Sequence, residues 1–139
     1  MQMYVWTYTT PNRTSDLDNG VIAHEFGHGV SNRLVGGPAN VNCLTNVEQM
    51  GEGWSDFMAL CLSAENGDDP AGTYAIGGYT AQFFWSGFQD NYYFGIRRYP
   101  YSTDLAKNPL TYADIDPAQL AFPPGVPRNL NVTTGATAP

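Results

Sequence analysis

The sequence contains few basic residues. Six Lys and Arg stand against 13 Asp and Glu in 139 residues, which gives a net charge of −7 at pH 7. The longest basic run is the pair Arg97-Arg98. Proteins that bind nucleic acid or anionic membrane surfaces use clusters of Lys and Arg. The composition therefore excludes nucleic acid and membrane surfaces from the expected partners.

Long hydrophobic runs are also lacking. No stretch approaches the ~20 apolar residues that a membrane-spanning helix needs. The first ten residues have no basic segment followed by a long apolar one, so they are not a signal peptide. Residues 2–9 are instead rich in Tyr, Val, Trp and Thr, which favours a β-strand. We expect this strand to begin in mid-structure, with Met1 as an internal residue of a longer parent protein.

Cysteine is scarce, and the two residues present do not form a metal motif. Cys43 and Cys61 lie far apart and neither belongs to a CxxC pair. One disulfide and two free thiols remain the alternatives. Because Cys61 lies in the apolar run "FMALCL", a buried free thiol is one expectation for it.

Histidine is equally scarce, but its placement is informative. The only two, His24 and His28, lie in "GVIAHEFGHGVSNRLVGG", residues 20–37. At about 100° per residue, their side chains would be separated by about 40° around a helix. Two imidazoles four residues apart can therefore converge on one ion, as in the pattern H-E-x-x-H. Glu25 lies beside the pair, where it can reach a metal-bound water as a general base.

The surrounding residues predict a helix over about residues 20–36. Asp18 or Asn19 is expected to cap its start, and Gly36-Gly37-Pro38 to end it. An apolar residue recurs every fourth position, which predicts a core face opposite the histidines; its members are Ile22, Phe26, Val30 and Leu34.

Two histidines do not complete a catalytic zinc site, which takes three protein ligands and one open position. In the pattern H-E-x-x-H-x-x-G-x-x-H the third histidine would fall on Leu34, so that class is excluded. Since no other histidine exists, the third ligand must be a carboxylate or a cysteine.

The stretch "GEGWSD", residues 51–56, offers the best candidate for the third ligand. Glu52 and Asp56 lie four residues apart in a second predicted helix, over about residues 47–64. A His/His/Glu site suits one Zn²⁺ per chain, and Asp56 could then accept the far ring N–H of a ligand histidine. The alternative is an exposed acidic face. The expected core residues of this helix are Trp54, Phe57, Met58, Cys61 and Leu62.

The rest of the chain carries weaker signals. Gly51 and Gly53 are poor helix formers and suggest the close approach of another backbone. Residues 73–100 are dense in aromatics, and their pattern fits helix and strand alike. The Tyr and Arg side chains of residues 73–101 include candidate transition-state donors, among which nothing selects. Residues 116–139 are rich in Pro, Thr and Gly and are expected to be loop-like.

Four segments together resemble the fungalysin family of secreted zinc metallopeptidases, which are thermolysin-like gluzincins. They are "MQMYVWTYTTPNR", "DLDNGVIAHEFGHGVSNRLVGGPAN", "MGEGWSDF" and "GIRRYPYSTDLAKNPLTYADI". The resemblance implies an α+β fold, mainly helical around the site, with a zincin-like core in which a strand precedes the two helices. It implies an extracellular zinc endopeptidase with protein or peptide substrates.

Carried over residue by residue, the resemblance implies particular roles. His24, His28 and Glu52 would be the zinc ligands, Glu25 the general base, and Asp56 the partner of a ligand histidine. Family catalytic domains are longer than this chain, and members supply further transition-state groups, commonly another histidine. We therefore expect residues 1–139 to be part of a catalytic domain, with exposed helix faces that the rest of the parent domain and its propeptide would cover.

Two alternatives to an active endopeptidase remain. One is a catalytically incomplete fragment that retains the zinc helices as a structural or binding element. The other is an aminopeptidase with the same ligand set, which expects a shorter gap between the second histidine and the glutamate than residues 29–51, and an amine-binding segment that the sequence lacks. A parent frame with an upstream propeptide and a downstream histidine motif would favour the endopeptidase.

Overall fold

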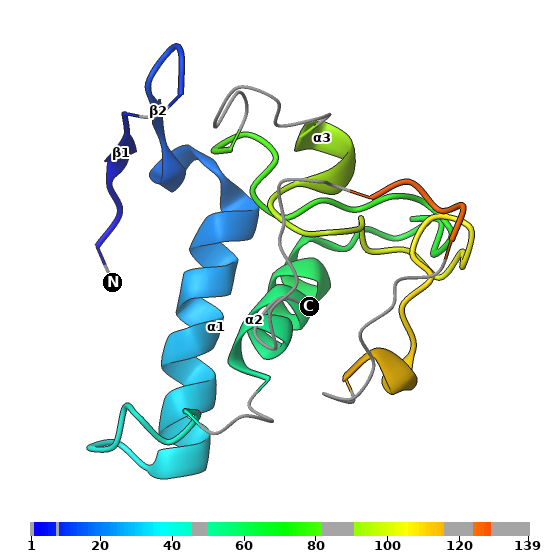
Figure 1. Ribbon diagram of the computed structural model, residues 1–139. Helices are drawn as coiled ribbons and strands as arrows, with labels where there is room; N and C mark the ends of the chain where they lie inside the picture. Colours follow the sequence, from blue (N-terminus) through cyan, green and yellow to red (C-terminus); the bar gives the residue numbers. More distant parts are fainter. Residues whose placement is uncertain (1, 8, 46–49, 82–90, 116–123, 129–139) are drawn as a thin grey trace.

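Two helices form the centre of the structure. The computed structural model describes residues 2–7, 9–45, 50–81, 91–115 and 124–128. Helix α1 (Asn19–Gly36) and helix α2 (Gly51–Ser63) pack against each other, and the remaining segments surround them (Figure 1). Helix α1 begins and ends close to the predicted positions 20 and 36. Helix α2 lies within the predicted range 47–64, of which residues 47–49 lie outside the described residues.

The ends of α1 follow the local sequence signals. Asp18 is the N-cap, and its Oδ1 accepts the backbone N–H of Val21 at 3.3 Å, which satisfies one of the unpaired donors of the first turn. After the helix, Gly37 has a φ of 79°, a backbone conformation that residues other than glycine rarely adopt. Its N–H donates to the Arg33 carbonyl at 3.0 Å. Of the two expected caps, the structure selects Asp18.

The two helices touch through small residues. A Cβ placed on Gly27 would lie 2.9 Å from Cα of Ser55, so only glycine allows this approach. On α2, Ser55, Asp56 and Ala59 are completely buried. The expectation of a close contact at Gly53 was wrong, because a Cβ there would meet nothing within 4 Å. The close contact is made instead by a glycine of α1.

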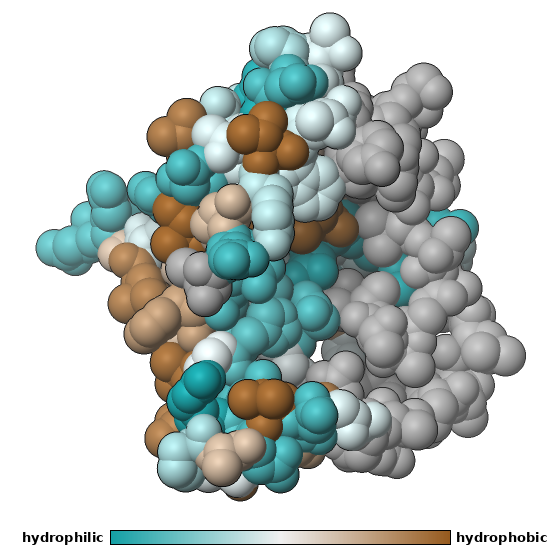
Figure 2. Space-filling view, turned by 90° about the vertical axis from the view of Figure 1, so that its left-hand side faces the viewer, coloured by the Kyte–Doolittle hydropathy of each residue, from teal (hydrophilic) through white to brown (hydrophobic). Residues whose placement is uncertain are grey.

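The predicted apolar core faces were also wrong. On α1, Phe26 is 57% exposed and Leu34 is 82% exposed, because the histidine face is the one that packs on α2. On α2, Trp54, Phe57 and Leu62 are likewise exposed. Figure 2 shows the side of the molecule on which α1 lies, where hydrophobic side chains reach the surface among polar ones. Small residues bring the polar site between the helices, which turns the large apolar side chains outward.

Both cysteines are free thiols. Cys43 is half-buried, and its Sγ lies 3.1 Å from the carbonyl oxygen of Asn32 in α1. Cys61 is exposed, so the expectation of a buried thiol in α2 was wrong. The disulfide alternative is not formed.

The strands are short. β1 (Val5–Trp6) pairs antiparallel with β2 (Arg13–Thr14), with Val5 opposite Thr14. The predicted strand over residues 2–9 is therefore limited to two residues, and a single turn of 3₁₀ helix, η1 (Ser15–Leu17), leads from β2 to α1. None of the helices in the described ranges is both long and apolar enough to cross a membrane.

The described parts of the aromatic region after α2, residues 73–81 and 91–100, are mostly extended chain and turns. Tyr74 and Tyr101 form an isolated antiparallel bridge with backbone hydrogen bonds of 3.0 and 2.9 Å. Between them lies the four-residue helix α3 (Asn91–Phe94), and Gly95 (φ 59°) then runs directly against the Ile76 backbone. This arrangement brings residues 97–101 to α2. A second 3₁₀ turn, η2 (Tyr112–Ile115), follows, and of residues 116–139 only 124–128 are described.

Candidate metal centre

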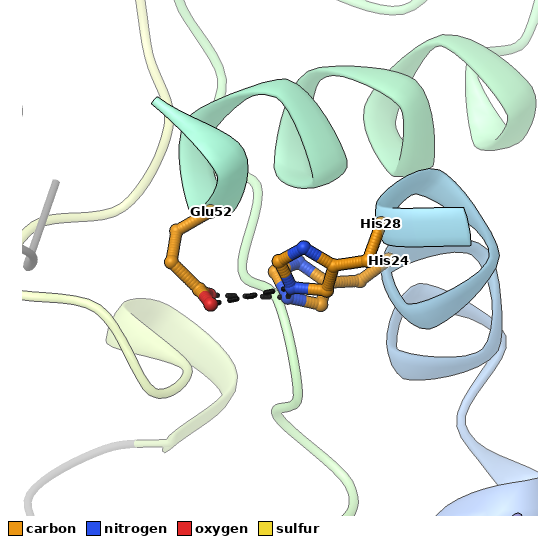
Figure 3. Close-up of side chains that lie close together, drawn as sticks. All are labelled: His24, His28 and Glu52. Carbon is orange, nitrogen blue, oxygen red and sulfur yellow. Dashed lines mark hydrogen bonds and ion pairs between the residues drawn. The ribbon is translucent and has the colours of Figure 1, made fainter. Parts of the chain in front are cut away.

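His24, His28 and Glu52 converge on one point between the two helices. The Nε2 atoms of the histidines lie 3.0 Å apart. Glu52 Oε2 is 3.1 Å from His24 Nε2, and Oε1 is 3.2 Å from His28 Nε2. Figure 3 shows both imidazoles reaching from α1 toward the carboxylate that descends from α2. Helix α1 supplies two donors because its positions 24 and 28 lie on one face, and α2 supplies the third.

These separations fit a small tetrahedral metal ion. Zinc bonds to imidazole nitrogen and carboxylate oxygen at about 2.0–2.1 Å, which places neighbouring ligand atoms about 3.3 Å apart. The three measured separations lie within a few tenths of an ångström of that value. His24 is buried, whereas His28 is half-buried and the Glu52 side chain is 37% exposed. The group can therefore hold a metal ion that solvent reaches from the side of His28 and Glu52.

Asp56 lies behind His24. Its Oδ1 is 2.6 Å from Nδ1 of His24, and its side chain is completely buried. An aspartate at this position accepts the Nδ1–H proton, which fixes the tautomer of the ring and turns the Nε2 lone pair toward the other donors. Asp56 is one turn after Glu52 on α2, so a single helix carries both carboxylates. The alternative of an exposed acidic face is contradicted for Asp56.

Two further residues contact these carboxylates, and sequence reasoning did not select them. Arg97 Nε donates to Asp56 Oδ2 at 2.6 Å, and its Nη2 reaches Asp56 Oδ1 at 2.8 Å and Glu52 Oε2 at 3.1 Å. The Tyr101 hydroxyl donates to Asp56 Oδ2 at 2.5 Å. Arg97 belongs to the aromatic region and Tyr101 directly follows it, and the contacts span 41 and 45 residues. Local periodicity carries no signal for contacts at that separation.

The charges of the site are strongly coupled. Burial alone would lower the pKa of His24, but its hydrogen bonds to Asp56 and Glu52 raise that pKa to about 9. The hydrogen bond with His24 and the nearby Arg97 lower the pKa of Glu52 to about 2, against an opposing effect of burial. Burial opposes ionisation of Asp56, yet hydrogen bonds from His24 and Arg97 hold its pKa below the ordinary value. In the absence of metal, His24 therefore carries the proton that a cation would displace.

Glu25 is available to solvent. It lies on α1 directly after His24, its side chain is exposed, and it makes no hydrogen bond or ion pair with another described residue. All five residues singled out in the sequence thus lie on α1 and α2, and four of them form one chain of contacts centred on His24.

Comparison with known proteins identifies the family. The profile described as fungalysin metallopeptidase (M36) matches residues 1–125. The chain is 48% identical over 118 residues to the extracellular metalloproteinase mep of Aspergillus fumigatus, covering 84% of this chain and 17% of that protein. Over 117 residues it is 47% identical to extracellular metalloproteinase 2 of Arthroderma otae and of Trichophyton rubrum, covering 83% of this chain and 17% of each. The chain thus spans only a small part of the length of these relatives, and it belongs to the fungalysin metallopeptidase family.

Proposed function

We propose that this chain carries the catalytic metal centre of a zinc-dependent endopeptidase, with His24, His28 and Glu52 as the zinc ligands. The observation that carries the proposal is the convergence of two Nε2 atoms and one carboxylate within 3.0–3.2 Å. Two imidazoles and a carboxylate suit zinc, and three protein ligands leave a fourth position for the reaction. One zinc per chain is expected, in a zincin-like arrangement of the two helices.

The chain's own residues supply the proton chemistry. When bound, zinc would polarise the peptide carbonyl and lower the pKa of a water in the open position. Glu25 would accept a proton as the water attacks the carbonyl carbon, and then donate it to the nitrogen of the departing amine. Asp56 would keep the His24 ring oriented throughout, through the 2.6 Å hydrogen bond to Nδ1.

Protein or peptide substrates follow from membership of a peptidase family. The relatives are named extracellular metalloproteinases, and we propose secretion for this protein on that ground. The chain corresponds to 17% of those relatives, so a substrate cleft would draw on parts of the protein beyond α1 and α2. The exposed apolar faces of both helices support the expectation that such parts, or a propeptide, cover them.

The test measures zinc content and casein hydrolysis on the same purified protein. We expect one zinc per chain, and hydrolysis that a chelator abolishes and added zinc restores. Glu25→Gln should keep the zinc and lose the hydrolysis, because it retains the ligands and removes the base. Glu65→Gln is the matched control, since Glu65 is an exposed acidic residue in the turn after α2.

The outcomes separate the alternatives. Zinc without hydrolysis in the wild-type chain would favour the catalytically incomplete fragment and leave the ligand assignment in place. A folded protein that binds no zinc would overturn the assignment itself. Release of single N-terminal residues from peptides, without internal cleavage, would favour the aminopeptidase.

A further inference from the structure

Arg97 and Tyr101 reach the metal centre from a segment remote from α1 and α2. We propose that they are positioning residues: together they hold Asp56 and Glu52 in the orientation that presents His24 and Glu52 to the metal. This inference rests on the proposed zinc centre and adds two residues to it. It assigns them a role through the ligands, not through contact with the substrate.

The Asp56 carboxylate accepts hydrogen bonds at both of its oxygens. An ionised carboxylate offers about four lone-pair positions on its two oxygens. Oδ1 accepts from His24 Nδ1 and Arg97 Nη2, while Oδ2 accepts from Arg97 Nε and the Tyr101 hydroxyl. All four positions are therefore occupied. The plane of the carboxylate is fixed from both sides, and with it the direction of the hydrogen bond to His24.

Arg97 also joins the two carboxylates of α2. Its Nη2 donates to both Asp56 Oδ1 at 2.8 Å and Glu52 Oε2 at 3.1 Å. The planar guanidinium has fixed donor directions, so it sets the relative positions of the oxygens that it binds. Glu52 is only partly buried and would otherwise rotate among several rotamers. Arg97 thereby restrains a proposed ligand directly.

Asp56 and Arg97 are both largely buried and carry opposite charges. The Asp56 side chain is 0% exposed and that of Arg97 is 13% exposed. A buried carboxylate needs a cationic partner and hydrogen bonds to compensate for its lost hydration. A histidine that binds a metal is neutral, so His24 cannot supply that charge in the metal-bound state. Among the described residues, Arg97 is then the cation that forms an ion pair with Asp56.

Tyr101 is itself held in place by the backbone. The bridge between Tyr74 and Tyr101 fixes both residues through two hydrogen bonds. Tyr101 points its hydroxyl at Asp56, whereas the Tyr74 hydroxyl donates to the carbonyl of Asp69 at 2.8 Å, away from the centre. The two tyrosines therefore form a matched pair in which only one hydroxyl touches the site.

The experiment measures the zinc dissociation constant by competition with a chromophoric chelator at fixed pH. The variants are Arg97→Gln, Arg97→Lys and Tyr101→Phe, and the controls are Tyr74→Phe and Arg33→Gln. Removing a group that orients a ligand typically weakens metal binding about 10–100-fold. We expect a loss in that range for Arg97→Gln and a smaller one for Tyr101→Phe. Arg97→Lys should lose less affinity than Arg97→Gln, because lysine keeps the positive charge but lacks the planar set of donors of the guanidinium.

A spectroscopic measurement separates positioning from general stability. With Co²⁺ in place of zinc, the visible absorption bands report the geometry of the ligands. We expect these bands to shift in Arg97→Gln and Tyr101→Phe and to remain unchanged in both controls. Should Arg97→Gln fail to fold, as judged by circular dichroism of the metal-free protein, Tyr101→Phe and Arg97→Lys decide the question.

Two failures are distinguishable. If Arg97→Gln and Tyr101→Phe bind zinc as tightly as the wild type and leave the cobalt bands unchanged, the positioning role alone is overturned. A wild-type protein that binds no zinc, and in which His28→Ala changes nothing, would overturn the proposed metal centre and the positioning role with it.

Discussion

Gly27 of α1 lies directly against Ser55 of α2, close enough that a Cβ on Gly27 would come within 2.9 Å of the Ser55 Cα. This contact sets the distance between the helices one residue before His28 and one residue before Asp56. The separation of the proposed ligands therefore depends on a residue that carries no chemistry of its own.

Gly27→Ala should destabilise the protein. The added methyl group meets the backbone and side chain of Ser55 at 2.9–3.2 Å, and overpacking of this kind costs about 1–3 kcal/mol. Gly29→Ala is the matched control, because its nearest contact is the Arg33 Nη1 at 3.8 Å, and alanine favours a helix by about 1 kcal/mol. Urea denaturation should show the first variant less stable and the second at least as stable as wild type. Equal effects in both would contradict the close contact.

Asp56→Asn should weaken zinc binding. The amide can still accept from His24, but its NH₂ group then faces the donors of Arg97 and Tyr101. A loss of about 10–100-fold in zinc affinity is expected for a group in this position. Chelator competition measures it, and Asp68→Asn, in the exposed turn after α2, provides the control. Wild-type affinity in Asp56→Asn would show that His24 needs no orienting partner.

The stability of the metal-free protein should depend on pH through His24 and Glu52. His24 has a raised pKa, about 9 against 6.5, so its contribution is complete below pH 6.5 and is lost as the pH rises through 9. Glu52 has a lowered pKa, about 2 against 4.5, so its contribution is complete above pH 4.5 and is lost as the pH falls through 2. Denaturation of the chelator-treated protein should show both contributions together between pH 4.5 and 6.5. A His24→Gln variant that kept the alkaline decline would exclude His24 as its source.

Zinc binding should become stronger over the alkaline range in which the metal-free protein loses stability. A ligand histidine must be neutral, so zinc displaces the proton of His24. With one proton released, the apparent affinity should rise about tenfold per pH unit up to about pH 9, the pKa of His24. Calorimetry in buffers of different ionisation enthalpy counts the released protons directly. Binding without proton release between pH 6.5 and 9 would contradict a protonated His24 in the metal-free state.

In the chain of residues 1–139 by itself, the exposed apolar face of α1 should tolerate polar substitution. Leu34 is 82% exposed, so Leu34→Lys removes hydrophobic surface and should raise solubility without lowering the melting temperature. Ile76→Lys is the contrasting variant: Ile76 is 3% exposed, and a buried charge there should destabilise the fold. A large fall in melting temperature for Leu34→Lys would mean that another part of the protein packs on this face.

The sequence predicts which candidate residues come together better than it predicts the packing. His24 and His28 are four residues apart, and so are Glu52 and Asp56. Residues at this spacing lie on the same face of any helix that contains them. Burial is different, because periodicity shows that Phe26 and Leu34 share a face but not what lies against it. The contacts of Arg97 and Tyr101 with Asp56 depend on the path of the chain after α2. That path is set by long-range backbone contacts, such as the one between Ile76 and Ile96.

The division of the three donors between two helices has a consequence for the chain as a whole. A metal ion bound by His24, His28 and Glu52 would be a cross-link that closes residues 29–51 into a loop. Because these ligands converge only in the folded chain, the metal would favour the folded state by an amount that grows with the logarithm of the free metal concentration. Cleavage in the exposed stretch 38–42, between α1 and α2, would then leave two pieces joined by the metal as well as by the packing of the helices, so a chelator should weaken their association.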